Sequence, residues 1–138
     1  ADLDAYYAWW AEHPAVTHAD IAAADLREYA AHDLVGDEPE MRSSVNAQVV
    51  RDDGVDLFAV TDAVTLSVEA VLLCAPRGMV DDPNPMQPLS IVQAWAAQDP
   101  RRRRAIEVPD VNHYTIAWGS HGSAMVADEI ARAVSARA

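Results

Sequence analysis

Apolar positions in the first third of the chain recur at helical spacing, and turn-forming residues divide them into segments. The predicted helices cover about 2–13, 17–35 and 39–51. Pro14 and Gly36 would end the first two helices, Pro39 would sit in the first turn of the third, and Gly54 would follow its end. The pattern therefore predicts a helical N-terminal region.

The pattern changes in the second half. An apolar run over Val68–Ala75, broken only by Glu69 and including β-branched residues, is typical of a strand buried on both faces of a sheet. The segments predicted to follow it are a helix from Pro88 or Leu89 to about 98, a strand over about 105–108 and a helix over about 120–137. Val126, Ile130 and Val134 form an apolar stripe on the last helix.

This order of helices followed by strand, helix, strand and helix indicates an α/β protein with a parallel sheet. We expect a helical region over 1–60 and a βαβα region over 61–138. Two parallel strands leave unpaired edges and are too few for a stable sheet, so the complete fold is expected to contain more strands.

Composition narrows the function classes. The chain has 138 residues, 51% of them apolar and 23% charged, which is typical of a soluble globular protein. The net charge of −12 argues against a nucleic-acid partner. Cys74 is the single cysteine, which excludes an internal disulfide, and no apolar run is long enough to cross a membrane. We expect a cytoplasmic protein without a cofactor or metal.

The most informative residue is His113, in the loop that follows the second predicted strand. Ligands of open α/β sheets bind beyond the carboxyl ends of the strands, and His113 lies about five residues past such an end. A histidine there can act as a general base, because its pKa lies near neutral pH. His121, at the head of the final helix, is a weaker candidate for the same role.

The stretches VEAVLLCAPRGMVDDPNPMQP and VPDVNHYTIAWGSHGSAMVADEIARAV resemble the C-terminal half of an α/β-hydrolase, especially the thioesterase branch. The resemblance implies that His113 is the histidine of a Ser-acid-His triad and that the preceding helices form a lid. It also implies an acyl ester or thioester as the small-molecule substrate. About half of the chain takes part in this resemblance.

The acid of the triad has two possible origins. In the α/β-hydrolase chain order an acid follows the penultimate strand, where Asp81 and Asp82 lie. Both lie further from the strand end than the family's usual short turn. The thioesterase branch places the acid after an earlier strand, which would put it before Ala1.

The nucleophile is not in this sequence. No Gly-x-Ser-x-Gly elbow occurs, and the GSHGS segment at 119–123 lacks the required spacing. We therefore expect a missing N-terminal half to supply the serine, and this chain alone to be inactive. The alternative is a non-catalytic interaction or dimerisation domain derived from the same fold, with a homodimer as its simplest form.

Two further groups have candidate roles. The aromatic residues Tyr6, Trp9 and Trp10 could line an acyl pocket, although aromatics at helical spacing are more often core. The basic run Arg101–Arg104 is expected to pair with neighbouring carboxylates, and binding of an anionic carrier domain is the weaker interpretation.

Overall fold

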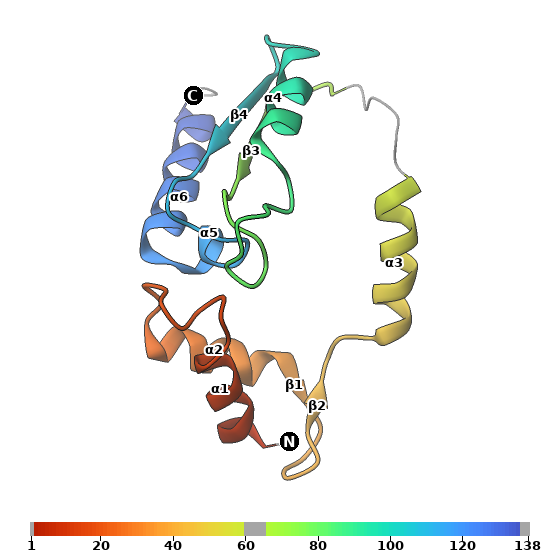
Figure 1. Cartoon of the computed structure of the whole chain (residues 1–138), viewed down its shortest axis with the longest axis vertical. Coiled ribbons are helices and arrows are strands. Elements are labelled where there is room, and N and C mark those ends of the chain that lie inside the picture. Colours follow the sequence, from red (N-terminus) through yellow and green to blue (C-terminus); the bar gives the residue numbers. More distant parts are fainter. Residues whose placement is uncertain (1, 60–65, 136–138) are drawn as a thin grey trace. The chain divides into compact units, whose positions relative to one another are not determined.

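The structure, a computed structural model, describes residues 2–59 and 66–135, with the backbone alone for 54–59. The chain divides into two compact units (Figure 1). The first unit contains Ala1–Ala11 and Ala22–Thr65, and the second contains Glu12–Ile21 and Leu66–Ala138. The segment 12–21 thus groups with the C-terminal unit, although the sequence suggested a single division near residue 60.

The N-terminal unit consists of helices and a short hairpin. Its elements are α1 (Leu3–Ala11), α2 (Ala23–Asp33), β1 (Leu34–Val35), β2 (Arg42–Ser43) and α3 (Ala47–Ala59). The Asp2 carboxylate accepts a hydrogen bond from the Ala5 amide at 2.7 Å and so caps the first helix. β1 and β2 pair in antiparallel orientation.

Three helix-boundary predictions in the first 59 residues are wrong. Thr17 does not open a helix, because its hydroxyl donates to the His13 carbonyl at 2.8 Å within a turn. Pro39 lies between β1 and β2 and not in a helix. The third helix instead begins after Asn46, whose side chain accepts the Gln48 amide at 2.8 Å, and it continues past Gly54 to Ala59.

Buried Asp33 holds the hairpin together. Its carboxylate accepts hydrogen bonds from the hydroxyls of Ser43 and Ser44, at 3.2–3.3 Å, and its carbonyl accepts the Ser44 amide at 2.7 Å. The Tyr6 hydroxyl, from α1, donates to the same carboxylate. These bonds connect α1, the end of α2 and the hairpin, which explains why the chain turns at residue 34 where a helix was expected to continue.

The C-terminal unit is a mixed α/β arrangement with a small parallel sheet. Its elements are β3 (Ala70–Cys74), α4 (Leu89–Ala97), β4 (Arg103–Glu107), α5 (Thr115–Trp118) and α6 (Ser120–Ser135). β3 and β4 pair in parallel, with Ala70 opposite Arg103 and Cys74 opposite Glu107. The predicted strand–helix–strand–helix order is confirmed, with α5 as an addition.

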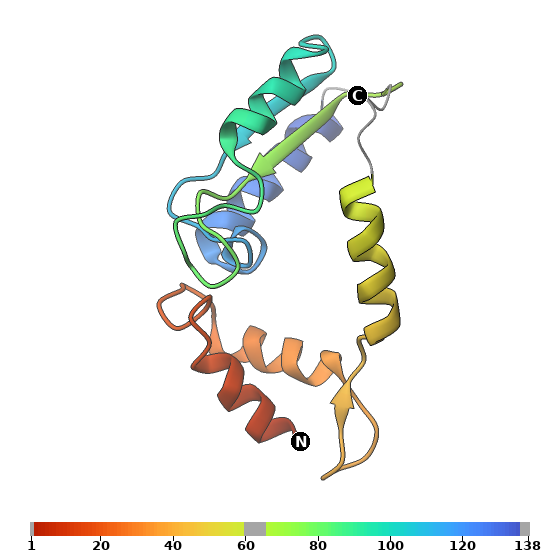
Figure 2. The ribbon, with the colours of Figure 1, turned by 45° about the vertical axis from the view of Figure 1, so that its right-hand side comes forward.

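Helices α4 and α6 cover opposite faces of this sheet (Figure 2). Successive residues of a strand point to opposite faces. Arg103 is buried against α4, where its guanidinium lies 5.2 Å from the Trp95 ring and donates to Gln98 Oε1 at 2.6 Å. Its neighbour Arg104 points the other way and pairs with Glu129 of α6 at 2.6 Å. The predicted pairing of the basic run with a carboxylate is thus confirmed at Arg104.

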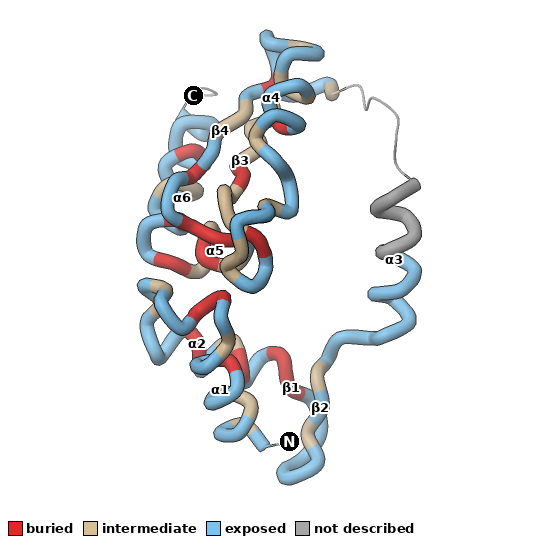
Figure 3. The backbone as a smooth tube through the Cα atoms, in the orientation of Figure 1, coloured by how far each residue is buried: buried red, intermediate tan, exposed pale blue. Residues whose placement is uncertain are grey.

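The core of this unit lies around the carboxyl ends of the strands (Figure 3). Val92, Val108, Val111 and Cys74 are all buried there. The rest of β3 is only half-buried, so the expectation of a strand buried on both faces is wrong for this structure. Within the described part of the chain β3 pairs with β4 alone, so its other edge gains no cover from a further strand.

Helix α6 packs closely against α5 at its start. A Cβ atom on Gly122 would lie 2.3 Å from the Thr115 carbonyl oxygen, so this approach of two backbones requires glycine. Further along the helix, Glu129 is buried by its ion pairs with Arg104 and Arg132, while Ile130 and Val134 of the predicted apolar stripe are exposed. Throughout the described ranges, no helix has the length and apolar character needed to span a bilayer.

Candidate functional site

Two loops meet beyond the carboxyl ends of β3 and β4. The parallel register brings Cys74 and Glu107 side by side at the strand ends, so the chain leaves both strands at the same edge of the sheet. Past that edge, Arg77 and Asn112 form a further parallel bridge. The His113 amide also reaches the Gly78 carbonyl, at 3.5 Å. The loop after β3 and the loop after β4 therefore form one connected surface.

His113 lies on this surface with its side chain exposed. It lines a cavity of about 170 Å³ together with the end of β3 and the following loop. The lining residues are Leu73, Cys74, Ala75, Arg77, Met86, Gln87, His113 and Ile116. The imidazole contacts the Tyr114 ring edge-on, with centroids 5.4 Å apart. An accessible imidazole over a small, partly apolar cavity is suited to proton transfer with a bound ligand.

Asp81 is held by two donors that both reach its Oδ1 atom. Arg77 Nε lies 2.6 Å from this oxygen and Asn112 Nδ2 lies 3.0 Å from it. Partial burial opposes ionisation, but the hydrogen bonds from Asn112 and Arg77 outweigh it and lower the pKa of Asp81 below its usual value. Asp81 also has a φ of 61°, so its backbone is in the left-handed region. The carboxylate is ionised and fixed in orientation.

Asp82 is part of the turn itself. Its Oδ1 accepts the Asn84 amide at 2.9 Å, and this bond is the main reason that the pKa of Asp82 is lowered. Its carbonyl accepts the Gly78 amide at 2.8 Å. The turn is so tight that a Cβ atom on Gly78 would lie 2.4 Å from Asp82 Oδ2. Of the two candidate acids, Asp82 therefore serves the loop geometry.

The structure does not bring either acid to the histidine. Among the residues described, neither Asp81 nor Asp82 hydrogen-bonds His113. Asp81 instead contacts the neighbouring residue, Asn112, and lines a second cavity. The two loops are assembled as expected, but neither candidate acid makes the acid–histidine contact of a complete triad among the described residues.

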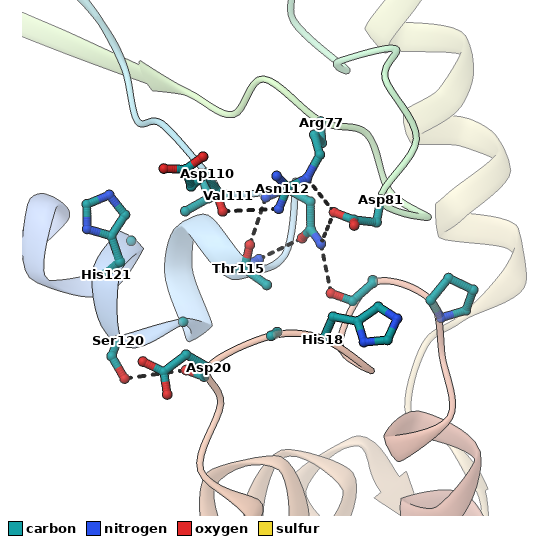
Figure 4. A pocket seen from close by; sticks show the side chains of 15 residues that line it. His18, Asp20, Arg77, Asp81, Asp110, Val111, Asn112, Thr115, Ser120 and His121 are labelled. Carbon is teal, nitrogen blue, oxygen red and sulfur yellow. Dashed lines mark hydrogen bonds and ion pairs between the residues drawn. The ribbon is translucent and has the colours of Figure 1, made fainter.

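The second cavity has a volume of about 200 Å³ and is lined by both polar and apolar residues (Figure 4). The loop segment 14–20 forms one wall, and the two strand-end loops with the start of α6 form the others. The titratable residues that line it are His18, Asp20, Arg77, Asp81, Asp110 and His121. Arg77 lines both cavities and donates to the Asp110 carbonyl at 3.0 Å. His121, the weaker histidine candidate, thus lies on a different cavity from His113.

Sequence reasoning did not single out Asn112, which lies at the centre of these contacts. It is 2% exposed, and its side chain bonds to three different segments of the chain. A signal was present, because asparagine side chains commonly accept backbone amides two or three residues later in turns. The Thr115 hydroxyl accepts the Asn112 amide at 2.7 Å, and Asn112 Oδ1 accepts the Thr115 amide at 2.9 Å.

The aromatic residues suggested as an acyl pocket form a cluster within the N-terminal unit. Tyr6 and Trp9 are stacked with centroids 5.9 Å apart, and Trp10 meets Tyr29 edge-on at 5.4 Å. Trp10 is buried and Trp9 is 53% exposed. Burial and the hydrogen bond to Asp33 raise the pKa of Tyr6 to about 12, so its hydroxyl stays protonated and donates. The acyl-pocket role stays a prediction.

The Cys74 thiol is not activated by its surroundings. Burial, with the charge of Glu107, raises the pKa of the Cys74 thiol, so it is a poor nucleophile at neutral pH. Within the described part of the chain, no group of three or more His, Cys, Asp or Glu side chains is placed to hold a metal ion.

Comparison with protein-family models, with curated proteins and with solved structures found no match.

Proposed function

We propose that this chain is the histidine-bearing C-terminal part of a serine α/β-hydrolase that acts on an ester or thioester. One observation carries the proposal: His113 is exposed on a cavity at the carboxyl ends of two parallel strands. This is the edge at which α/β proteins bind ligands. His113 would take the proton of a serine hydroxyl and return it to the leaving group.

The serine and its elbow would come from a segment outside these 138 residues, because the sequence contains no Gly-x-Ser-x-Gly. The open edge of the β3–β4 pair is a suitable place for the strands of that segment. Asp81 is the preferred acid within this chain, since Asp82 is bound into its turn. Asp81 would have to approach the imidazole once the sheet is complete, or the acid would come from the serine-bearing segment.

Co-expression tests this proposal. The chain is co-expressed with the polypeptide encoded directly upstream, and hydrolysis of p-nitrophenyl acetate and butyrate is measured. We expect hydrolysis by the pair, no hydrolysis by the chain alone, and a loss of at least about a hundredfold with His113→Ala. His121→Ala is the matched control and should retain activity. An inactive pair, or full activity in His113→Ala, would overturn the proposal.

The exposed apolar residues of α6 favour a second candidate, an interaction or dimerisation domain. Ile130 is 59% exposed and Val134 is 67% exposed on the same helix. Light scattering of the purified chain distinguishes the two possibilities. A stable dimer that Ile130→Asp dissociates, together with an inactive co-expressed pair, would favour the interaction domain.

A further inference from the structure

Asn112 uses the full hydrogen-bonding capacity of its side chain. Nδ2 donates to the Ala15 carbonyl at 2.8 Å and to Asp81 Oδ1 at 3.0 Å. Oδ1 accepts the backbone amides of Tyr114 at 3.0 Å and Thr115 at 2.9 Å. A carboxamide has two donor hydrogens and two acceptor lone pairs, so each one is occupied. A buried polar group satisfied in this way fixes the position of everything it binds.

The two ends of the Asn112 side chain must play opposite hydrogen-bonding roles. The Oδ1 end must accept from two amides, and the Nδ2 end must donate to a carbonyl and to a carboxylate. Aspartate has the same shape and could still accept from the two amides. At the other end it would place a second negative charge about 3 Å from Asp81, where like charges disfavour ionisation. The position therefore requires an amide for a reason beyond the local turn at residues 112–115.

We infer that Asn112 is a positioning residue of the proposed active site, whose side-chain amide fixes the Asp81 carboxylate at one end and the backbone carrying His113 at the other. This inference rests on the proposed function for its catalytic meaning. The backbone on the far side of His113 is fixed through the amides of Tyr114 and Thr115. The His113 amide itself bonds to the loop that carries Asp81, at Gly78.

At the other end, Asn112 and Arg77 together determine the orientation of Asp81. Both donors bind Oδ1, and within the described ranges no hydrogen bond reaches Oδ2. One oxygen is thus anchored and the second stays available to a donor. The other charged and titratable groups around this cavity come from the loop after β4, from α6 and from the segment 14–20: they are Asp110, His121, His18 and Asp20.

Asn112→Asp is the decisive variant, because it keeps the acceptors for Tyr114 and Thr115 and removes both donors. The readout is the pKa of the Asp81 carboxyl, followed by carbon-detected NMR in the full chain, together with the imidazole resonances of His113. We expect Asp81 to become about a tenfold weaker acid and the His113 resonances to shift. The added charge beside Asp81 raises its pKa whatever the role of Asn112, so the His113 resonances decide. A role in the local turn alone predicts that they stay unchanged, since aspartate accepts from the two amides as well as asparagine does.

The matched control is Thr115→Ala. It removes the hydroxyl that accepts the Asn112 amide, at the same buried turn, and it leaves the Asn112–Asp81 bond in place. We expect the pKa of Asp81 to stay unchanged in this variant. An equal change of that pKa in Thr115→Ala and Asn112→Asp would overturn the inference, because it would show a general response to loosening of the turn.

The exchanged pair, Asn112→Asp with Asp81→Asn, provides the rescue. The amide is then at 81 and the carboxylate at 112, so the donor and acceptor of this bond are reversed but present. We expect the His113 resonances to return towards those of the original chain. This double variant also decides the outcome if Asn112→Asp does not fold: a folded exchanged pair supports the inference, and an unfolded one overturns it.

These measurements need no substrate, so they separate the inference from the proposed function. If the Asp81 pKa and the His113 resonances do not respond, the positioning role is wrong even where the co-expressed pair hydrolyses esters. If the Asp81 pKa and the His113 resonances respond but the co-expressed polypeptides do not hydrolyse esters, the positioning role of Asn112 is supported and the proposed hydrolase function is wrong.

Discussion

The carboxylates of Asp33 and Asp81 show two different uses of the same group. Asp33, in the N-terminal unit, is buried and accepts hydrogen bonds from three hydroxyls, of Tyr6, Ser43 and Ser44. Asp81, in the C-terminal unit, is 30% exposed at its side chain, lines a cavity and receives both hydrogen bonds at one oxygen. The Asp33 carboxylate thus stabilises the local structure, whereas the Asp81 carboxylate keeps one oxygen available to a ligand or partner.

The largest effect is expected for Asp33→Ala. The substitution leaves three partly buried hydroxyls without their acceptor and disconnects the hairpin from α1. We expect a loss of about 3 kcal/mol in the free energy of unfolding, measured by urea denaturation with tryptophan fluorescence. A loss below about 1 kcal/mol would show that Asp33 contributes no more to stability than Asp81 does, which would contradict the difference in role between the two carboxylates.

Tyr6→Phe tests the same network through one donor. Removal of the hydroxyl should cost about 1–2 kcal/mol, because Asp33 loses one partner and keeps two. The folded-state pKa of Tyr6, about 12, lies above the unfolded value of about 10. Its contribution is therefore fully present below pH 10 and is lost as the pH rises towards 12. Denaturation curves at pH 8 and pH 11 should converge for the original chain and Tyr6→Phe at the higher pH.

Asp81→Asn should have a smaller effect on stability, less than about 1 kcal/mol, because its ion pair with Arg77 is partly exposed. The pKa of Asp81 is lowered in the folded state, so its contribution is present above about pH 4 and is lost as the pH falls further. Asp81→Asn should thus flatten the stability profile on the acid side. An acid-side profile that stays the same would show that the Arg77 and Asn112 bonds contribute nothing.

His113→Ala is expected to leave stability unchanged within about 0.5 kcal/mol, since the imidazole is exposed. Combined with the activity loss proposed above, this result would place His113 with the functional residues and Asp33 with the structural ones. A large destabilisation by His113→Ala would instead indicate that the histidine holds the strand-end loops together.

The secondary structure of the C-terminal unit was predicted more accurately than that of the N-terminal unit, for physical reasons. β3 lies in an apolar run followed by a proline-rich loop, a pattern that distinguishes it from the helices. β4 begins with two arginines, and only its second half, from Ala105, lies in the predicted strand. The hairpin strands have two residues each, too short for any periodicity, and depend on Asp33 contacts with Ser43 and Ser44. Contacts of this kind, between residues ten apart, are not visible in a hydrophobic pattern.

The site was predictable in part. Position after a strand identified His113 and the loop of Asp81, because the carboxyl ends of parallel strands share one edge. Asn112 was missed because its importance comes from Ala15 and Asp81, which are distant in sequence. The burial of Glu129 was also not predictable from the sequence pattern, because it depends on the ion pair with Arg104 of β4.

The segment 12–21 has a consequence for the order in which the molecule folds. Ala15 meets Asn112 across a separation of 97 residues, and Asp20 meets Ser120 across 100. The entropy cost of closing so long a loop must be met before these bonds contribute, which slows folding. During synthesis, residues 12–21 leave the ribosome long before their partners exist. We therefore expect the wall that they provide to the second cavity to be among the last parts of the molecule to form.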